Sequence, residues 1–121
     1  MMANVLAVDD SKSMREMMKV VLEKNGHTVE TAEDGFQALD LAKATSFDII
    51  LSDINMPKMS GIALVAKLRE LPDYAYIPIL MVTTESADYR KLKAKASGAT
   101  GWLEKPISEE RILKAISKVL N

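Results

Sequence analysis

The chain has 121 residues, of which 48% are apolar and 27% are charged, and its formal net charge is -1. This length suits a single domain over residues 1–121, and the small net charge predicts no attraction to nucleic acid or to an anionic membrane. The sequence has no cysteine, which excludes disulfide bonds and thiolate metal sites. Because no run reaches the roughly 18 apolar residues of a membrane span and the N-terminus lacks a signal-peptide pattern, we expect a cytoplasmic protein without membrane insertion. We also expect a monomer.

Short apolar runs alternate with segments of helical periodicity along the whole chain. The runs, which we expect to be strands, cover residues 5–8, 27–31, 47–52, 77–82 and 101–104. Between them, apolar residues recur at the i, i+3, i+4, i+7 spacing of amphipathic helices. The clearest stripes are Met14, Met17, Met18 and Val21; Leu64, Val65, Leu68 and Leu71; and Ile112, Leu113, Ile116, Val119 and Leu120. These stripes are interpreted as the core-facing sides of helices.

Polar residues and glycines mark the expected helix ends. Asp34 and Gln37 have the spacing of a capping box. Gly26 and Gly98 suit helix C-termini. Three further residues are of a type that caps helix N-termini: Ser11, Ser60 and Ser108.

The order of elements is strand then helix, repeated five times. The third and fourth runs contain IILS and ILMV, which are apolar on consecutive residues, as in strands covered on both faces. Alternating strands and helices form parallel sheets with helices on both sides. The sequence therefore predicts an α/β fold, a doubly wound five-stranded parallel sheet with five helices.

Chemically reactive side chains stand where the expected strands end. The first strand ends at Asp9 and Asp10, the third at Asp53, the fourth at Thr83 and Thr84 and the fifth at Lys105. Ligands of open parallel sheets bind outside the carboxyl ends of the strands. We therefore expect three carboxylates, a hydroxyl group and an ammonium group to meet at one edge of the sheet.

This set of groups suits Mg²⁺ and phosphate chemistry. Carboxylate oxygens are ligands for Mg²⁺, which is commonly shared with phosphate oxygens. A carboxylate can also act as a nucleophile and form an aspartyl phosphate. Phosphoryl transfer depends mainly on neutralising the charge of the phosphoryl oxygens, which Mg²⁺ and Lys105 could do, with Thr83 as a hydrogen-bond donor. A cation between Asp9, Asp10 and Asp53 would also relieve the repulsion between these side chains.

The sequence resembles the receiver domain of bacterial two-component response regulators, and within that family its single-domain chemotaxis members. The resemblance covers all 121 residues and rests on VDDS at 8–11, SDINMPKMSG at 52–61, MVTTES at 81–86 and KP at 105–106. It implies the strand order 2-1-3-4-5 of a flavodoxin-like sheet. It further implies a phosphorylation-activated switch that takes its phosphoryl group from a sensor histidine kinase and needs Mg²⁺.

The resemblance also implies a role for each site residue. Asp53 would accept the phosphoryl group, with Thr83 and Lys105 each contacting one of its oxygens. Mg²⁺ would be held by Asp53, by Asp10 directly and by Asp9 mainly through water. The backbone carbonyl of Asn55 would be a further metal ligand. The Lys105–Pro106 peptide bond would be cis, an isomer that proline makes accessible.

Two residues depart from the family pattern. Trp102 occupies the position of the aromatic switch residue, where Tyr or Phe is usual, and its larger ring could limit inward rotation. Thr84 follows the switch hydroxyl, where Ala or Gly is usual, and adds bulk beside the phosphoryl site. Both residues are expected to affect switching.

Other classes of function fit less well. A phosphatase of the haloacid dehalogenase type also uses an Asp nucleophile and Mg²⁺, but it needs a second Asp where this chain has Asn55. A flavodoxin-like cofactor binder would need a glycine-rich phosphate loop after the first strand, and none is present. A calcium loop beginning at Asp53 fails because Pro57 takes the next ligand position. The sequence therefore favours a phosphoacceptor switch over an enzyme.

The resemblance places the output surface on the fourth helix, fifth strand and fifth helix, where a downstream protein such as a flagellar motor switch component would bind. The residues expected to line it are Ser86, Tyr89, Arg90, Trp102, Glu104, Ile107 and Lys118. A basic run in the same region is interpreted as a solvated helix face rather than a binding patch. It consists of Arg90, Lys91, Lys93 and Lys95.

Overall fold

The computed structural model describes residues 2–84 and 88–120. The strands are β1 (Asn4–Val8), β2 (Thr28–Ala32), β3 (Ile49–Ser52), β4 (Ile79–Thr83) and β5 (Gly101–Glu104). The helices are α1 (Lys12–Lys24), α2 (Gly35–Ala44), α3 (Gly61–Arg69), α4 (Asp88–Ala96) and α5 (Glu109–Leu120), with a 3₁₀ turn, η1 (Pro72–Tyr74), before β4. Over the described residues, none of the helices combines the length and apolar character that crossing a bilayer requires.

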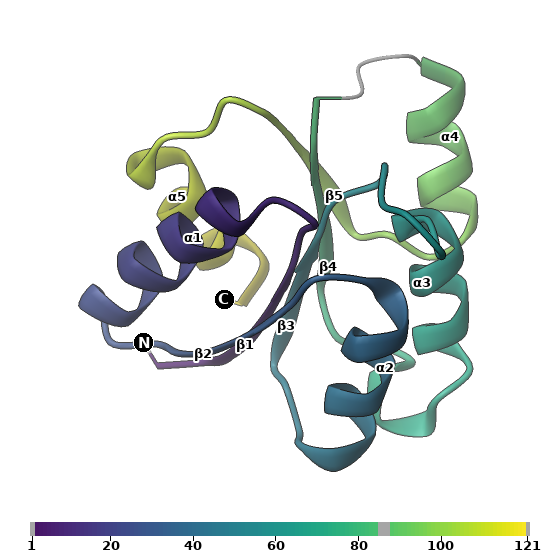
Figure 1. The fold of residues 1–121 in the computed structure, drawn as a ribbon, viewed down its shortest axis with the longest axis horizontal. Helices are drawn as coiled ribbons and strands as arrows, with labels where there is room; N and C mark the ends of the chain where they lie inside the picture. Colours follow the sequence, from purple (N-terminus) through teal and green to yellow (C-terminus); the bar gives the residue numbers. More distant parts are fainter. Residues whose placement is uncertain (1, 85–87, 121) are drawn as a thin grey trace.

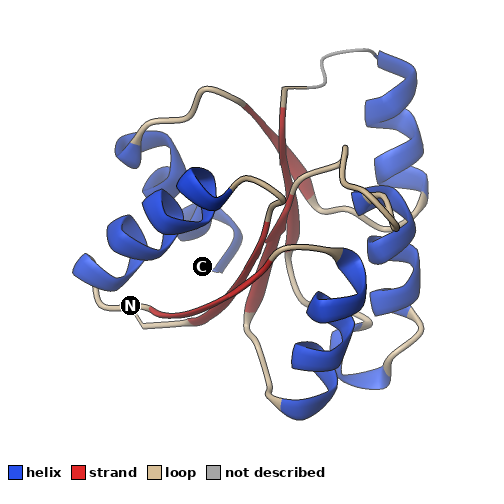
Figure 2. Cartoon of the chain, viewed as in Figure 1, coloured by secondary structure: helices blue, strands red, loops and turns tan. Residues whose placement is uncertain are grey.

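The five strands form one parallel sheet in the order β2-β1-β3-β4-β5. Figure 2 shows the strands in red between the helices. The fold class and the strand order are confirmed. Val8 pairs with Ser52 across β1 and β3, and Thr83 pairs with Glu104 across β4 and β5. All strands therefore end along the same edge, which we call the carboxyl edge. The edge at which they begin is called the amino edge.

Helices cover both faces of the sheet. Helices α1 and α5 lie on one face, and α2, α3 and α4 lie on the other (Figure 1). Two clusters of buried apolar residues fill the space between these layers and the sheet. Every residue of β3 and β4 is buried, which agrees with their consecutive apolar residues, whereas every residue of β5 is only half-buried. The sheet is therefore fully buried at β3 and β4 and more accessible at β5.

The helix ends follow the expected capping chemistry. The side chains of Ser11, Asp34, Ser60 and Ser108 each accept a hydrogen bond from a backbone N–H of the helix that follows. Gly26 and Gly98 have φ values of 93° and 113°, a left-handed conformation that glycine adopts without strain.

One helix start differs from the expected capping box. Gln37 does donate its backbone N–H to Asp34 Oδ1, but its side chain accepts from the backbone N–H of Glu33 rather than from that of Asp34.

Four predicted strands have different bounds in the structure, and the first begins one residue earlier than predicted, at Asn4. The second runs from Thr28 to Ala32, and His27 lies just before it, where its Nδ1 accepts a hydrogen bond from Ala3 N–H. The third begins at Ile49, since Phe47 is buried without joining the sheet. The fourth begins at Ile79 and extends to Thr83, because Pro78 has no N–H with which to extend the ladder. The apolar runs that predicted the second, third and fourth strands therefore begin before the first residues of those strands.

Two side chains form hydrogen bonds with the segments that precede the strands at the amino edge. The guanidinium of Arg69, at the end of α3, donates to the carbonyl oxygens of Gly98, Tyr74 and Ile77 at 2.7–3.0 Å. The buried hydroxyl of Tyr74 lies 2.7 Å from the carbonyl oxygens of both Ala42 and Thr45. These bonds join the segments that enter β3, β4 and β5.

Candidate functional site at the carboxyl edge

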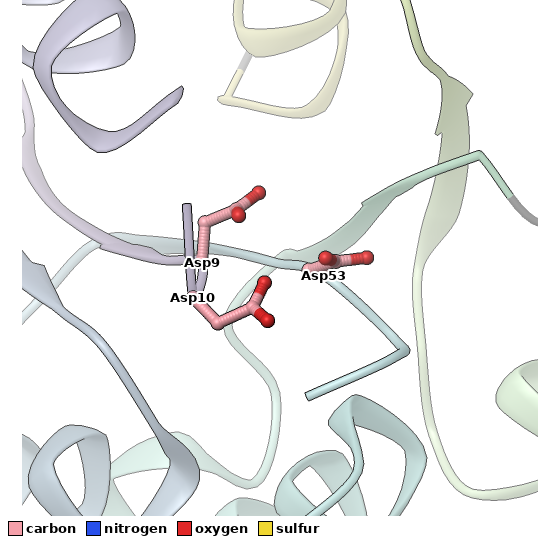
Figure 3. A group of neighbouring side chains, drawn as sticks. All are labelled: Asp9, Asp10 and Asp53. Carbon is pink, nitrogen blue, oxygen red and sulfur yellow. The ribbon is translucent and has the colours of Figure 1, made fainter. Parts of the chain in front are cut away.

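The carboxyl edge brings Asp9, Asp10 and Asp53 together. Each offers a carboxylate oxygen within 4.8 Å of those of the other two. Figure 3 shows the three side chains as neighbours just beyond the ends of β1 and β3. These residues lie close together because Val8 of β1 pairs with Ser52 of β3, and Asp9 and Asp53 are the next residues after this pair.

Asp9 is held in place by its backbone and its side chain. It is fully buried, its N–H donates to Ala32 O, and its carbonyl accepts from Arg15 Nη1 at 2.8 Å. Its Oδ1 accepts the Ser11 N–H at 2.9 Å. Burial raises the pKa of Asp9, although Lys105 and the Ser11 N–H oppose this change. The carboxylate therefore sits where an added cation would be favourable.

Asp53 directly follows β3 and lies at the centre of the site. Its side chain is almost fully buried, and Oδ1 accepts the Ile54 N–H at 2.7 Å. A Cβ atom at Gly61 would lie 1.9 Å from the carbonyl oxygen of Asp53, so only glycine allows α3 to begin this close to the strand end. The position of Asp53 thus depends on a residue eight positions further along the chain.

Lys105 supplies the positive charge of the site. Its ammonium lies 2.7 Å from Asp9 Oδ2 and 3.3 Å from Asp53 Oδ2, and its side chain is 17% exposed. Burial lowers the pKa of Lys105, but the two carboxylates outweigh this effect and raise it. The following peptide bond, Lys105–Pro106, is cis, as expected. Lys105 therefore remains cationic and partly neutralises Asp9 and Asp53.

The donor set fits a hard divalent cation such as Mg²⁺. Asp9 and Asp53 are buried, whereas Asp10 is exposed and would leave room for water in the coordination sphere. The loop after β3 carries Asn55, whose side chain is exposed. A bound Mg²⁺ would share its charge with phosphate oxygens.

The predicted switch residues lie on the neighbouring strands. Thr83 is fully buried at the end of β4, and its carbonyl accepts the Lys105 N–H at 2.9 Å. Thr84 is exposed in the next position. Trp102 is half-buried on β5, where it packs against the apolar cluster on the α2–α4 side of the sheet. Thr83 and Trp102 are thus joined through the pairing of β4 with β5.

The residues expected on the output surface are partly described. Arg90, Glu104 and Ile107 are half-buried, and Lys118 is exposed. Ser86 and the side chain of Tyr89 lie outside the described part of the chain. The basic run is not a uniformly solvated face, because Lys91 is half-buried and contacts both Glu104 and Trp102.

Some residues that shape the site were not identified from the sequence. Gly61 contributes through the close approach of its backbone to Asp53, and Arg15 through its guanidinium, which donates to Asp9 O. Only the glycine before an apolar stripe was a usable signal. Lys58, in the loop after β3, has a φ of 70° and lies 3.5 Å from Asp34 Oδ2. The pKa of Asp34 is lowered mainly by the Gln37 N–H and further by Lys58. This ion pair connects the loop that carries Asn55 to the start of α2.

Comparison with known protein families identifies one match along most of the chain. The model of the response regulator receiver domain matches residues 5–117.

Individual relatives agree with this match. The protein PilH of Pseudomonas aeruginosa is 38% identical over 119 residues, which cover 98% of each chain. The chemotaxis protein CheY-3 of Vibrio cholerae is 32% identical over 116 residues, covering 95% of this chain and 89% of that one. The crystallised chemotaxis protein CheY4 of Vibrio cholerae superposes with a TM-score of 0.95 at 49% identity, covering 98% of this chain and 99% of that one.

Proposed function

Since the chain belongs to the response regulator receiver domain family of two-component systems, we propose that it is a switch activated by phosphorylation of Asp53. The phosphoryl donor would be a phosphorylated histidine of a sensor kinase. The observation that carries this proposal is the position of Asp53: it directly follows the central strand, and its carboxylate is flanked by Asp9, Asp10 and the Lys105 ammonium.

The proposed reaction transfers one phosphoryl group. A carboxylate oxygen of Asp53 forms a bond to phosphorus while the P–N bond to the donor imidazole breaks. The imidazole leaves with the electron pair of that bond and is then protonated. Backbone donation from Ile54 fixes the carboxylate at 2.7 Å, and Lys105 provides positive charge on one side of the reacting group.

Mg²⁺ would neutralise negative charge on the phosphoryl oxygens. We assign Asp10 and Asp53 as its direct ligands, Asp9 as a ligand mainly through water, and the backbone carbonyl of Asn55 as a further ligand. The short distances among the three carboxylates support this assignment. Their chemistry also supports it, because Mg²⁺ prefers oxygen donors.

We further propose that the switch proceeds from Thr83 to the surface formed by α4, β5 and α5. The Thr83 hydroxyl would bind a phosphoryl oxygen, and Trp102 would change its surroundings in response. Thr84 is exposed beside this site and would affect the access of donors or water. The downstream partner would bind this surface in its changed form.

A role in chemotaxis-like signalling is proposed from the relatives. Two of them are named as chemotaxis proteins, and they match this chain along nearly its whole length. A flagellar motor switch component is therefore our proposed class of output partner.

Intact-mass measurement after incubation with acetyl phosphate and Mg²⁺ tests the function. We expect one phosphoryl group per chain, lost on treatment with hydroxylamine, which cleaves acyl phosphates but not phosphoserine. Asp53→Ala should remain unmodified, whereas Asp48→Ala, an exposed position just before the same strand, should be modified normally. Modification of Asp53→Ala, or full modification in a chelator, would contradict the proposal. Continuous release of phosphate from small phosphate esters would favour a phosphatase instead.

A further inference from the structure

The position of Trp102 shapes the surface around β5. Trp102 lines three neighbouring hollows: one beside α5 of about 410 Å³, one beside α4 of about 250 Å³, and one beside Lys105 of about 590 Å³. A movement of this one ring would change all three. Whatever fixes the ring therefore fixes the shape presented to a partner.

The indole ring is not held by a hydrogen bond of its own. Its Nε1–H is buried and has no partner among the residues that the structure describes. A buried donor without an acceptor is unfavourable compared with one that is bonded or exposed to water. Other contacts must therefore stabilise this position of the ring.

Lys91 provides such a contact from α4. Its ammonium lies 5.5 Å from the centre of the Trp102 ring, within the range of a cation–π interaction. The same ammonium is 3.2 Å from Glu104 Oε1, with the two side chains 39% and 46% exposed. Glu104 follows Trp102 by two residues, so both side chains stand on the same face of β5. We call this set of three residues the Lys91 bridge.

The Lys91 bridge adjoins the residue proposed to sense phosphorylation. Glu104 is the direct pairing partner of Thr83 across β4 and β5, and the next N–H, that of Lys105, donates to Thr83 O at 2.9 Å. A displacement of Thr83 at the end of β4 would therefore also displace Glu104, its pairing partner on β5. It would then alter the distance between Glu104 and the Lys91 ammonium.

We propose that Lys91 is a positioning residue that holds Trp102 in its half-buried position on β5. It does so by bridging the ring and Glu104, and switching requires this bridge to open. The inference rests on the proposed function and adds a specific opposing contact to it. The bridge depends on charge at a partly exposed site, so salt should weaken it.

The first test compares the accessibility of the Trp102 ring among variants and needs no phosphorylation. All tryptophan fluorescence comes from this residue, because Trp102 is the only tryptophan of the chain. Acrylamide quenching of its fluorescence is compared in the wild type, Lys91→Met, Glu104→Gln and Lys91→Arg. Loss of the ammonium should raise the quenching constant by about twofold, while Lys91→Arg should retain the wild-type value. Lys93→Met is the matched control, since Lys93 is exposed on the same helix and should have no effect.

The second test measures the affinity for beryllofluoride, a mimic of the phosphoryl group, by calorimetry in the presence of Mg²⁺. Without the bridge, less work is needed to reach the switched state, so Lys91→Met should bind about threefold more tightly than the wild type. Glu104→Gln should change the affinity in the same direction. The difference between Lys91→Met and the wild type should shrink in 1 M salt, whereas Lys93→Met should match the wild type throughout.

The outcomes distinguish the role of Lys91 in positioning Trp102 from its role in regulating the switch. Unchanged quenching in Lys91→Met would overturn the positioning role. Changed quenching with unchanged or weaker beryllofluoride binding would overturn the regulatory role. If the wild type itself failed to bind beryllofluoride, the proposed function would be refuted and the regulatory role with it. The quenching data would still decide whether Lys91 positions the ring.

Discussion

The two edges of the sheet use polar groups in different ways. At the amino edge, Arg69 and Tyr74 donate to backbone carbonyls and connect segments that enter the strands. At the carboxyl edge, Asp9, Asp53 and Lys105 contact one another, and their carboxylates and ammonium are directed into a shared space. The comparison indicates that one edge maintains the fold while the other is available for chemistry. Substitutions should therefore change stability at the amino edge and reactivity at the carboxyl edge.

Gly61→Ala should break this separation, and we expect the largest effect from it. The new Cβ would meet the Asp53 carbonyl at 1.9 Å, so either the backbone of α3 or the end of β3 must shift. We expect a loss of about 3 kcal/mol or more in the free energy of unfolding, measured by urea denaturation, together with slower phosphorylation. Gly26→Ala is the control, because its Cβ would meet nothing within 4 Å and only the positive φ is unfavourable. Equal losses for both variants would contradict the close-packing explanation.

Arg69→Met should lower stability without altering the chemistry. The substitution keeps an apolar stem but leaves the carbonyls of Gly98, Tyr74 and Ile77 without their donor. We expect the free energy of unfolding to fall by about 2–4 kcal/mol. The extent of acetyl phosphate labelling should stay normal at temperatures where the variant is folded. Arg111→Met, at an exposed residue whose contacts are 3.4 Å long, should cost less than about 0.5 kcal/mol.

Tyr74→Phe tests the stabilising role of the amino edge with the loss of one hydroxyl group. It removes a single buried hydroxyl that serves two carbonyls, so we expect a loss of about 1–2 kcal/mol in the free energy of unfolding. Tyr76→Phe is the matched control, because Tyr76 is 96% exposed. A similar loss in both variants would show that the hydroxyl bonds of Tyr74 do not stabilise the fold.

The Tyr74 hydroxyl should also give a pH signature. Burial raises the pKa of Tyr74 above its ordinary value of 10.0. Its contribution to stability is therefore fully present below about pH 10 and is lost at higher pH, where the unfolded chain ionises first. The stability difference between the wild type and Tyr74→Phe should accordingly shrink above about pH 10.

Asp10→Asn should give the smallest effect, and one of opposite sign. Removing this exposed charge relieves repulsion by Asp9 and Asp53, so without metal the variant should gain about 0.5 kcal/mol in the free energy of unfolding. The gain should disappear when Mg²⁺ is added, because the wild type binds the cation more tightly than Asp10→Asn and is therefore stabilised more by it. Asp9→Asn should instead lose stability, since Lys105 loses its 2.7 Å partner. A stabilised Asp9→Asn variant would contradict the role of that ion pair.

Much of the fold was predictable because the information is local. Runs of apolar residues and capping side chains determined the order of strands and helices, and the ends of β1, β3 and β4 placed Asp9, Asp53 and Thr83 on one edge. The strand order came from the resemblance to a family. The partners of Arg69 and Tyr74 could not be predicted, since a backbone carbonyl has no signature in the sequence. The contact of Lys91 with Trp102 was also missed, because a basic run in a sequence does not indicate which of its side chains contacts a ring on another element.

The strand order also affects how copies of the chain meet. Strands β2 and β5 are the outer strands of the sheet, with five and four residues. Each also carries a carboxylate, Glu30 on β2 and Glu104 on β5. Short outer strands with charged side chains are poor templates for pairing with a second chain. The open sides of this sheet therefore resist edge-to-edge aggregation, a useful property for a protein whose β5 must stay accessible.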